Sequence, residues 1–164
     1  MTIIVCDTGP ILHLAEADAL SLLGGAGQIL IASAVENELS LLTAAEIKAD
    51  WLHVVALEPA YADNALTLQA SGLLHIGEAQ SLALVRQTNA TWFLTDDAAA
   101  RMMATSLGIE VHGSLGIVLW AAAKGYITRS MTECYIDRLA ESSLWISPRV
   151  LEQAKFSLDL LFDK

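Results

Sequence analysis

The sequence predicts an α/β fold in which a central parallel sheet carries helices on both faces. Over residues 2–124, short β-branched or apolar runs alternate with segments of helical spacing, a pattern typical of βαβ units. The remaining residues, 128–164, contain two helical patterns and no strand. We therefore expect a sheet-containing domain over 1–127 and a C-terminal helical extension over 128–164 that packs on that domain or on a partner.

Length and composition favour one apolar, non-membrane domain. At 164 residues and 17.5 kDa, the chain can bury roughly 70% of its unfolded surface in a single core. Its hydrophobic fraction of 54% is high, but polar or charged residues interrupt every apolar stretch before the ~18 residues that a membrane span needs. No signal-like start is present. We expect a cytoplasmic protein whose apolar surface is partly covered in a homo-oligomer or by a partner.

The N-terminal third of the chain predicts two strands separated by short helices. The first β-branched run ends at the turn sequence Asp7-Thr8-Gly9-Pro10. Apolar residues at helical spacing follow in two pieces, and Gly24-Gly25 should break the second piece. The predicted strands are 2–6 and 28–32, and the predicted helices are 11–15 and 17–23.

Two capping boxes follow the second strand. Ser33 with Glu36, and Thr43 with Glu46, have the spacing at which a hydroxyl and a carboxyl cap a helix start reciprocally. They predict two consecutive helices over 34–50. They also account for Glu36 without any chemical role.

The middle of the chain continues the alternation. One β-branched run ends at Glu58-Pro59, another precedes Asp96-Asp97, and helical stretches lie on either side of Ser71-Gly72. Gly108 and Gly125 should stop two later helices. The predicted strands are 51–57, 91–95 and 109–112, and the predicted helices are 60–71, 78–88, 98–107 and 115–124.

The C-terminal extension contains two helix-start signals. These are Ser130 with Glu133, and Ser147 with Pro148. The last helix carries an apolar stripe that can dock on the core or on a neighbour. Its members are Val150, Leu151, Ala154, Leu158, Leu161 and Phe162.

Aspartates follow two of the predicted strands. Asp7 closes the first strand, and Asp96-Asp97 closes the strand at 91–95. In open parallel sheets, ligands bind beyond the carboxyl ends of the strands, which is where these residues fall. Each aspartate also has an ordinary explanation as a turn residue or a helix cap. We expect one of the Asp96-Asp97 pair to cap the helix that follows.

Two glutamates border apolar helix faces. Glu38 lies three residues after Val35, beside the apolar face of its helix, and Glu78 heads a stripe that continues with Ser81 and Leu82. A solvated flank for Glu38 and a favourable helix-dipole position for Glu78 are the ordinary explanations. Acids after two strands and at two helix edges together predict an oxygen-ligand site for Mg²⁺ or Mn²⁺.

Other kinds of site lack support in the sequence. The histidines have no HxH or HExxH spacing for zinc, and no GxSxG, GxGxxG or P-loop motif occurs. Cys6 and Cys134 are too few for a disulfide framework. The tryptophans lack the interleaved basic residues of a base-stacking platform, so we expect them in the core. The residues concerned are His13, His53, His75 and His112 at the core edge or surface, and Trp51, Trp92, Trp120 and Trp145 in the core.

The net charge of −10 argues against nucleic-acid binding by general charge attraction. It does not exclude a nuclease, because an acidic pocket that holds a metal ion becomes locally positive. The acidic balance also fits a protein that pairs with a basic partner.

The acids and their flanking residues resemble the motifs of the PIN-domain superfamily, which includes the VapC-type toxins of bacterial toxin–antitoxin pairs. The similarity covers most of residues 2–127. The matching motifs are Asp7-Thr8 after the first strand, Val35-x-x-Glu38-Leu39, Gly77-Glu78-Ala79 and Leu94-Thr95-Asp96-Asp97. The stretch from Asp96 to Gly125, with Arg101 and His112-Gly113-Ser114-Leu115-Gly116, particularly resembles a PIN-like branch with few assigned functions.

This resemblance implies a three-layer α/β/α sandwich of the flavodoxin-like kind and a metal-dependent endoribonuclease that uses Mg²⁺ or Mn²⁺. RNA would be the substrate, and an antitoxin protein a possible partner. The implied catalytic acids are Asp7, Glu38, Glu78 and Asp97. The implied metal ligands are Asp7, Glu78, Asp96 and Asp97. The implied contacts to phosphate or to the site are Thr8, Thr95 and Arg101.

Two other functions compete with the ribonuclease. A PIN-like domain can keep its acids and act as a catalytically silent binding or regulatory module, with its C-terminal helices as the interface. A receiver-like phosphoacceptor also places acids beside a parallel sheet. That reading requires paired acids after the first strand, where Asp7 stands alone. The metal-dependent ribonuclease is the leading hypothesis.

Overall fold

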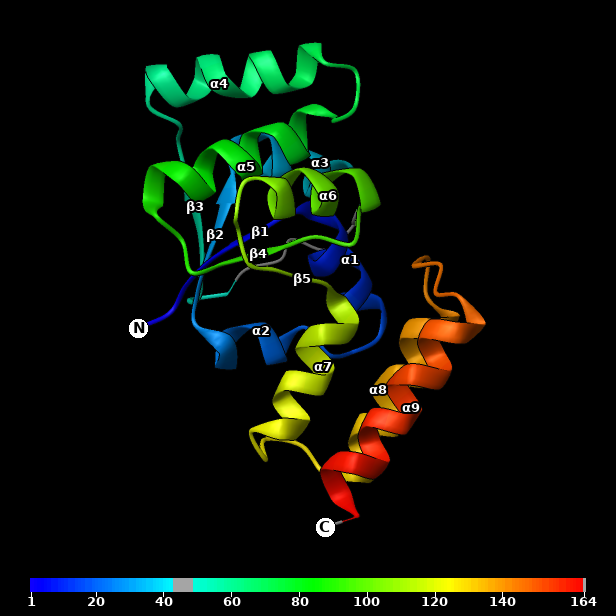
Figure 1. Cartoon of the computed structure of the whole chain (residues 1–164). Helices are drawn as coiled ribbons and strands as arrows, with labels where there is room; N and C mark the ends of the chain where they lie inside the picture. The colour runs from blue at the N-terminus through cyan, green and yellow to red at the C-terminus, as the bar shows by residue number, and fades with distance from the viewer. Residues whose placement is uncertain (43–48, 164) are drawn as a thin grey trace.

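A five-stranded parallel sheet forms the centre of the protein. The computed structural model describes residues 1–42 and 49–163. Its strands lie in the order β3-β2-β1-β4-β5, and every neighbouring pair is parallel (Figure 1). The strands are β1 (Ile3–Cys6), β2 (Gln28–Ala32), β3 (Leu52–Val55), β4 (Trp92–Leu94) and β5 (Val111–His112). The predicted α/β class is confirmed.

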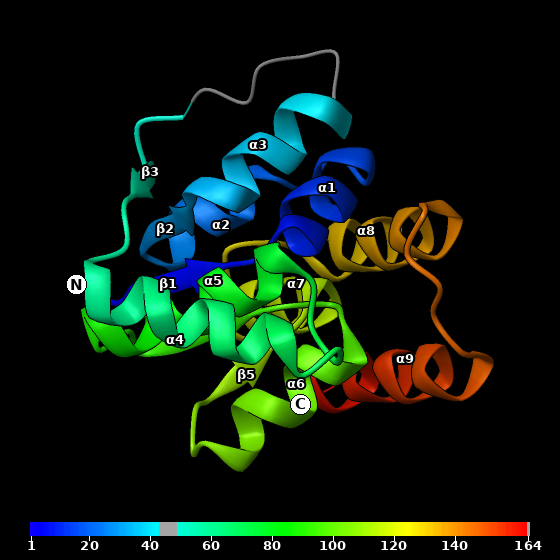
Figure 2. The ribbon, with the colours of Figure 1, turned by 90° about the horizontal axis from the view of Figure 1, so that it is seen from above.

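Helices cover both faces of this sheet. In Figure 1, α4, α5 and α6 lie above the sheet, whereas α2 and α7 lie below it. Helix α5 packs directly on β1, β2 and β4, and α4 packs outside α5 (Figure 2). The arrangement is the predicted three-layer α/β/α sandwich. The helices are α1 (Thr8–Glu16), α2 (Ser21–Ala26), α3 (Ser33–Leu42), α4 (Pro59–Ala70), α5 (Ile76–Thr88), α6 (Ala98–Ser106), α7 (Ser114–Ala123), α8 (Arg129–Glu141) and α9 (Pro148–Phe162).

Strand β1 is enclosed because it lies in the middle of the sheet. Ile4, Val5 and Cys6 have no exposed surface, and neither do Ile29 of β2 and Phe93 of β4. A strand that is covered on both faces can be apolar at every position, which explains the continuous apolar run at the start of the chain. This apolar run ends at Asp7, so the candidate site begins at the carboxyl end of a buried strand.

One predicted helix break is wrong. Helix α2 begins at Ser21 and continues through Gly24 and Gly25 to Ala26. A Cβ atom at Gly24 would lie 2.6 Å from Cδ1 of the Trp51 ring. This glycine therefore makes room for a tryptophan that arrives from a distant part of the chain, and it does not end the helix.

One predicted start in the C-terminal region is also wrong. Helix α8 begins at Arg129, and the hydroxyl of Thr128 caps it by accepting a hydrogen bond from the Met131 N–H at 3.2 Å. Thr128 thus takes the capping role expected of Ser130. The predicted cap at Ser147 is confirmed, because its hydroxyl accepts from the Val150 N–H at 3.2 Å. The predicted helix start at Thr43 with Glu46 lies outside the described residues.

Three of the four tryptophans pack against the core as predicted. Trp51, Trp92 and Trp120 are partly buried, and the rings of Trp92 and Trp120 meet edge to face with centroids 6.2 Å apart. The prediction is wrong for Trp145, which is 81% exposed. It lies in the loop that joins α8 to α9, and its neighbours Leu144 and Ile146 pack against the core while Trp145 itself does not.

Helices α8 and α9 form a hairpin that packs against α7 (Figure 1). Ile136 and Leu139 of α8 are buried, as are Ala154 and Leu158 of α9. The predicted apolar stripe of the last helix therefore faces the same chain. Its first member, Val150, is exposed.

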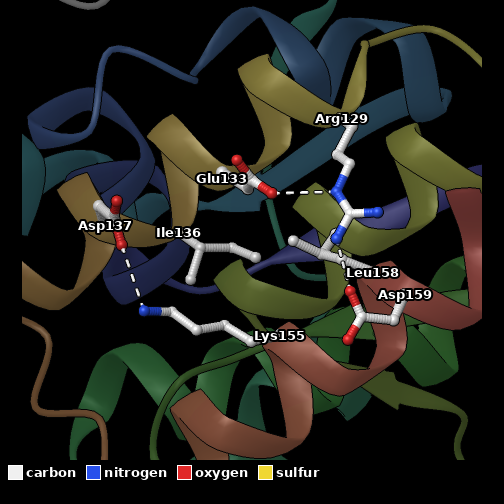
Figure 3. A pocket seen from close by; sticks show the side chains of 7 residues that line it. All are labelled: Arg129, Glu133, Ile136, Asp137, Lys155, Leu158 and Asp159. Atoms are coloured by element: carbon white, nitrogen blue, oxygen red, sulfur yellow. Dashed lines mark hydrogen bonds and ion pairs between the residues drawn. The ribbon is translucent and has the colours of Figure 1, made fainter.

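Arg129 joins the two helices of this hairpin on their outer side. Its guanidinium pairs with Glu133 of α8 and Asp159 of α9 (Figure 3), and also with Asp163 just after α9. A second bridge places Lys155 Nζ 3.8 Å from Asp137 Oδ1 (Figure 3). These exposed pairs link α8 to α9 on the solvent side of the hairpin, outside the buried apolar side chains of the two helices.

Apolar side chains also remain on the surface. Leu66, Met102 and Phe156 are among the large hydrophobic residues that are exposed. None of the helices in residues 1–42 and 49–163 is both long and apolar enough to cross a membrane. The homo-oligomer or partner that would cover such residues stays a prediction.

Candidate active site

Asp7 lies at the carboxyl end of β1 and is 4% exposed. Its Oδ1 accepts a hydrogen bond from the Thr8 N–H at 2.8 Å, and its Oδ2 accepts one from the Thr95 hydroxyl at 3.0 Å. The Asp7 N–H in turn donates to the Leu94 carbonyl at 2.9 Å. The pairing of β1 with β4 therefore brings Asp7 and the segment before Asp96 side by side.

Glu38 joins Asp7 from helix α3. The Thr8 hydroxyl donates a hydrogen bond to Glu38 Oε2. The carboxylate also lies against the start of α5, where a Cβ atom at Gly77 would come within 2.9 Å of Glu38 Cδ. Residue 77 must be glycine for Glu38 to take this position. The acid with the weakest support from the sequence thus belongs to the group.

Glu78 completes the group from the first turn of α5. Its Oε2 is buried and has no hydrogen-bond partner in the described residues. Burial, followed by the charges on Glu78 and Glu38, raises the pKa of Asp7 from 3.8 to about 7, although the hydrogen bonds from Thr8 and Thr95 lower it. We name Asp7, Glu38 and Glu78 the acid cluster.

The acid cluster has no counter-ion in the described part of the chain. The ion pairs formed there all involve other carboxylates. Buried carboxylates that repel one another reduce stability unless they are protonated or bind a cation. An unpartnered buried oxygen and two neighbouring carboxylates are oxygen donors of the kind that hard divalent cations prefer. The acid cluster therefore offers oxygen donors of the right chemical kind for such an ion, although its three carboxylates are not preassembled around one point.

Asp96 has a different environment. Its Oδ2 accepts a hydrogen bond from the Ser114 hydroxyl at 2.5 Å and lies 2.7 Å from His13 Nδ1, while Oδ1 accepts from the Ser114 N–H at 2.8 Å. Burial raises the pKa of Asp96, but the hydrogen bonds from His13 and Ser114 outweigh burial and hold it below its ordinary value. Asp96 is therefore a charged group whose oxygens are already bonded by the protein.

Asp97 caps helix α6, as expected for one member of the pair. Its Oδ2 accepts a hydrogen bond from the Ala100 N–H at 2.8 Å, and the residue is exposed. Its own N–H donates to the Thr95 hydroxyl at 3.1 Å, the hydroxyl that donates to Asp7. Asp97 thus supports the position of Thr95 through its backbone, while its side chain is engaged with the helix start.

Arg101 lies one turn into α6 and approaches the same strand end. Its Nη2 donates to the Thr95 carbonyl at 3.3 Å, and the residue is exposed. A Cβ atom at Gly113 would lie 2.7 Å from Asp96 Oδ1 and 2.9 Å from Arg101 Nη2. A glycine at this position therefore allows the carboxylate and the guanidinium to approach the start of α7 together.

The predicted metal ligands do not meet at one point. Counting only residues 1–42 and 49–163, no three His, Cys, Asp or Glu side chains are arranged to hold one metal ion. Asp7 and Glu78 belong to the acid cluster, whereas Asp96 and Asp97 have other partners. A site that used all four would require Asp96 and Asp97 to leave those partners. The ligand set Asp7, Glu78, Asp96 and Asp97 stays a prediction.

The sequence pattern predicted no role in the site for the side chains of two polar residues, His13 and Ser114. His13 was expected at the core edge or surface, and Ser114 entered only as part of a family motif. Ser114 lies two residues after the end of β5, and β5 pairs with β4 in the sheet. The signal that could have found Ser114 is therefore strand order, since adjacent parallel strands end at the same edge.

Comparison with known proteins agrees with this architecture. No curated protein sequence matches the chain. A protein-family model designated DUF3368 and described as a PIN domain matches residues 3–159, from β1 to the last turn of α9. The match includes most of the predicted C-terminal extension. PIN domains form a nuclease-type superfamily whose members generally depend on divalent metal ions. With the match spanning nearly its whole length, the chain belongs to this family of PIN domains.

Proposed function

We propose that this PIN domain is a metal-dependent ribonuclease that hydrolyses phosphodiester bonds of RNA at the acid cluster. The observation that carries the proposal is the buried, unpartnered Oε2 of Glu78 beside Asp7 and Glu38. Such crowding of like charges destabilises the fold. A bound divalent cation would remove that destabilisation, and perturbed carboxylates at the end of a parallel sheet are typical of functional sites.

The residues divide into those that hold the ion and those that position the acids. Asp7 and Glu78 would hold the cation, with Glu38 adding negative charge beside them. When bound, Mg²⁺ or Mn²⁺ supplies polarisation of a phosphoryl oxygen and a more acidic water molecule. The hydroxyl of Thr95 orients Asp7, and that of Thr8 orients Glu38.

Arg101 is the proposed phosphate contact. It is exposed, and the one hydrogen bond that its guanidinium forms in the described residues goes to a neutral carbonyl. A guanidinium without a carboxylate partner can offer its remaining donors to a phosphate oxygen. Its position beside the end of β4 places that contact next to the residues that orient Asp7.

The test of this function is cleavage of single-stranded RNA in the presence of Mn²⁺ or Mg²⁺. Asp7→Asn and Glu78→Gln should each reduce the rate on the order of 100-fold or more, because each removes a proposed ligand charge. Glu36→Gln is the matched control, since Glu36 is an exposed carboxylate on the same helix as Glu38. It should cleave at the wild-type rate.

Two outcomes would contradict the ribonuclease. Equal cleavage by wild type and Asp7→Asn would indicate a contaminating nuclease. No cleavage of any RNA with either metal would favour a catalytically silent PIN-like module. That alternative has an observation in its favour, because no three described side chains are preassembled for a metal ion. Calorimetric titration with Mn²⁺ separates the two, since a silent module needs no ion at Glu78.

The finer proposal is that the ribonuclease is the toxin of a toxin–antitoxin pair. The acidic charge of −10 suits a basic antitoxin protein. Expression of the wild-type chain alone should then arrest growth, and co-expression with a basic protein encoded beside it should restore growth. Growth arrest by Asp7→Asn to the same extent would contradict the toxin role.

A further inference from the structure

A groove leads away from the candidate active site between α7 and the loop that joins α8 to α9. It has a volume of about 470 Å³, and Asp96 and Arg101 belong to its lining. Leu115 and Leu119 of α7 contribute apolar surface, as do Leu144 and Ile146 of the loop. The groove thus combines an apolar interior with a basic group beside the residues that orient Asp7.

Trp145 is the most exposed large hydrophobic side chain of this groove. It belongs to the lining and is 81% exposed. The loop that carries it is tied down on both sides. Glu16 of α1 accepts hydrogen bonds at 2.7 Å from both the N–H and the hydroxyl of Ser143, and Ser147 caps α9. The indole is therefore presented to solvent by an anchored loop beside the groove.

The charges in the lining leave Arg101 as the group that can meet an anion. Asp96 is bonded to His13 and Ser114, and His112 pairs with Glu110 at 2.8 Å. Arg101 forms no ion pair with any described residue. An anion that enters the groove thus meets one guanidinium that is not paired with a described carboxylate and is hydrogen-bonded only to the Thr95 carbonyl.

The net charge of the chain indicates how a nucleic acid would be held here. With nine Lys and Arg against nineteen Asp and Glu, general charge attraction cannot supply the affinity. Stacking of bases on aromatic rings does not depend on net charge and tolerates any base sequence. An exposed tryptophan with one arginine nearby is a combination that suits a nucleotide.

We propose that this groove binds one unpaired nucleotide of the RNA substrate, with the base stacked on Trp145 and a phosphate held by Arg101. The inference deepens the proposed function and rests on it for the class of ligand. A volume of about 470 Å³ is within the range of small-ligand pockets and is large enough for a nucleotide. The C-terminal hairpin would then serve to present RNA to the acid cluster, with a preference for single strands.

Binding can be measured separately from cleavage. A fluorescein-labelled five-nucleotide RNA is titrated with the full chain in EDTA, and its anisotropy is recorded. Trp145→Ala should weaken binding by about 5- to 150-fold, the range expected for loss of one base–aromatic stack. Trp145→Phe should keep most of the affinity. Phe156→Ala is the matched control, because Phe156 is an exposed aromatic residue outside the groove lining, and it should bind like the wild type.

Two further arms identify the parts of the nucleotide. An oligonucleotide with abasic positions should bind wild type and Trp145→Ala equally, since it has no base to stack. Arg101→Ala should weaken binding of the ordinary oligonucleotide. It should also make the slope of log affinity against log salt concentration less negative by about 0.7, the value for one single-strand phosphate.

Equal affinities of wild type and Trp145→Ala, or no binding of the oligonucleotide by wild type, would overturn the proposal. So would sedimentation showing that wild type is a dimer and Trp145→Ala a monomer of unchanged RNA affinity, because Trp145 would then cover a second copy. The expected binding pattern without cleavage would contradict the ribonuclease and leave the groove standing. Cleavage of RNA together with unchanged binding by Trp145→Ala would support the ribonuclease and contradict the nucleotide groove.

Discussion

Two groups of three carboxylates in this molecule differ in whether a basic side chain neutralises them. Glu133, Asp159 and Asp163 surround Arg129 on the exposed side of the C-terminal hairpin. In the acid cluster at the end of β1, Asp7 is buried, Glu38 and Glu78 are half-buried, and no described basic side chain pairs with them. Water and a guanidinium compensate the first group, whereas no described basic side chain compensates the second and its Asp7 is shielded from water. The hairpin acids link two helices through Arg129, and the acid cluster is the proposed site of an external ion.

The pKa shifts express the same difference. The hydrogen bonds that Arg129 donates to Glu133 and Asp159 raise the pKa of Arg129, so folding favours its charged form. Burial, with the charges of its neighbours, raises the pKa of Asp7 to about 7, so folding favours its neutral form. One region is complete without a ligand. The other contains the acids at which we propose that a cation binds.

The largest expected effect is the pH dependence of stability without metal. Asp7 has a folded pKa of about 7, above its unfolded value of 3.8, so the folded state binds its proton more tightly between these values. The free energy of unfolding should therefore fall by about 4 kcal/mol as pH rises from about 4 to 7. Urea unfolding in EDTA at a series of pH values measures this fall.

Two variants test the origin of that pH dependence. Asp7→Asn should flatten the curve between pH 4 and 7, while Asp159→Asn in the hairpin should leave its slope unchanged. Asp96 does not interfere, because its lowered pKa causes loss of stability only as pH falls below this window. A slope that is the same in wild type and Asp7→Asn would show that the acid cluster does not carry the strain assigned to it.

A somewhat smaller effect is expected from divalent cations. At pH 7.5, Mn²⁺ at 100 times its dissociation constant should stabilise the wild type by about 2.7 kcal/mol, which raises Tm by roughly 5–10 °C. Differential scanning calorimetry with and without Mn²⁺ measures the shift. The double variant Asp7→Asn/Glu78→Gln should lose it, and Asp159→Asn should keep it. Loss of the shift in Asp159→Asn alone would place the ion at the hairpin instead.

The smallest effect is expected for Arg129. Arg129→Ala removes three exposed ion pairs that solvent screens, so Tm at low salt should fall by no more than about 4 °C. The deficit should shrink in 0.5 M NaCl, because salt screens the wild-type pairs. Thermal unfolding followed by circular dichroism checks both statements. A loss several times larger would mean that the hairpin depends on Arg129 rather than on its apolar contact.

Part of the acid cluster could be predicted because its positions follow from local pattern. Asp7 comes directly after a β-branched run that is apolar at every position, and such a run must be a buried strand whose end reaches the surface. Glu78 heads an apolar helical stripe, so its carboxylate had to lie at the edge of the core. Both statements depend only on residues within one element and its flanks.

The partners of Asp96 could not be predicted in this way. His13 and Ser114, which bond it, are 83 and 18 residues away along the chain and come from α1 and α7. Asp97 differs from its neighbour because its partner, Ala100, is three residues away. Local pattern therefore predicted that one of the pair caps α6, whereas only the fold decided which one.

The sequence by itself determined the alternation of strands and helices and the placement of Asp7 at the edge of the sheet, because periodicity and turn chemistry act over a few residues. Tertiary structure decided that Glu38 joins Asp7, that Glu78 Oε2 finds no hydrogen-bond partner among the described residues and that Trp145 faces solvent. These outcomes depend on which elements become neighbours. Burial and counter-ions are properties of that arrangement, and they separate a strained acid cluster from an exposed ion-pair network of similar composition.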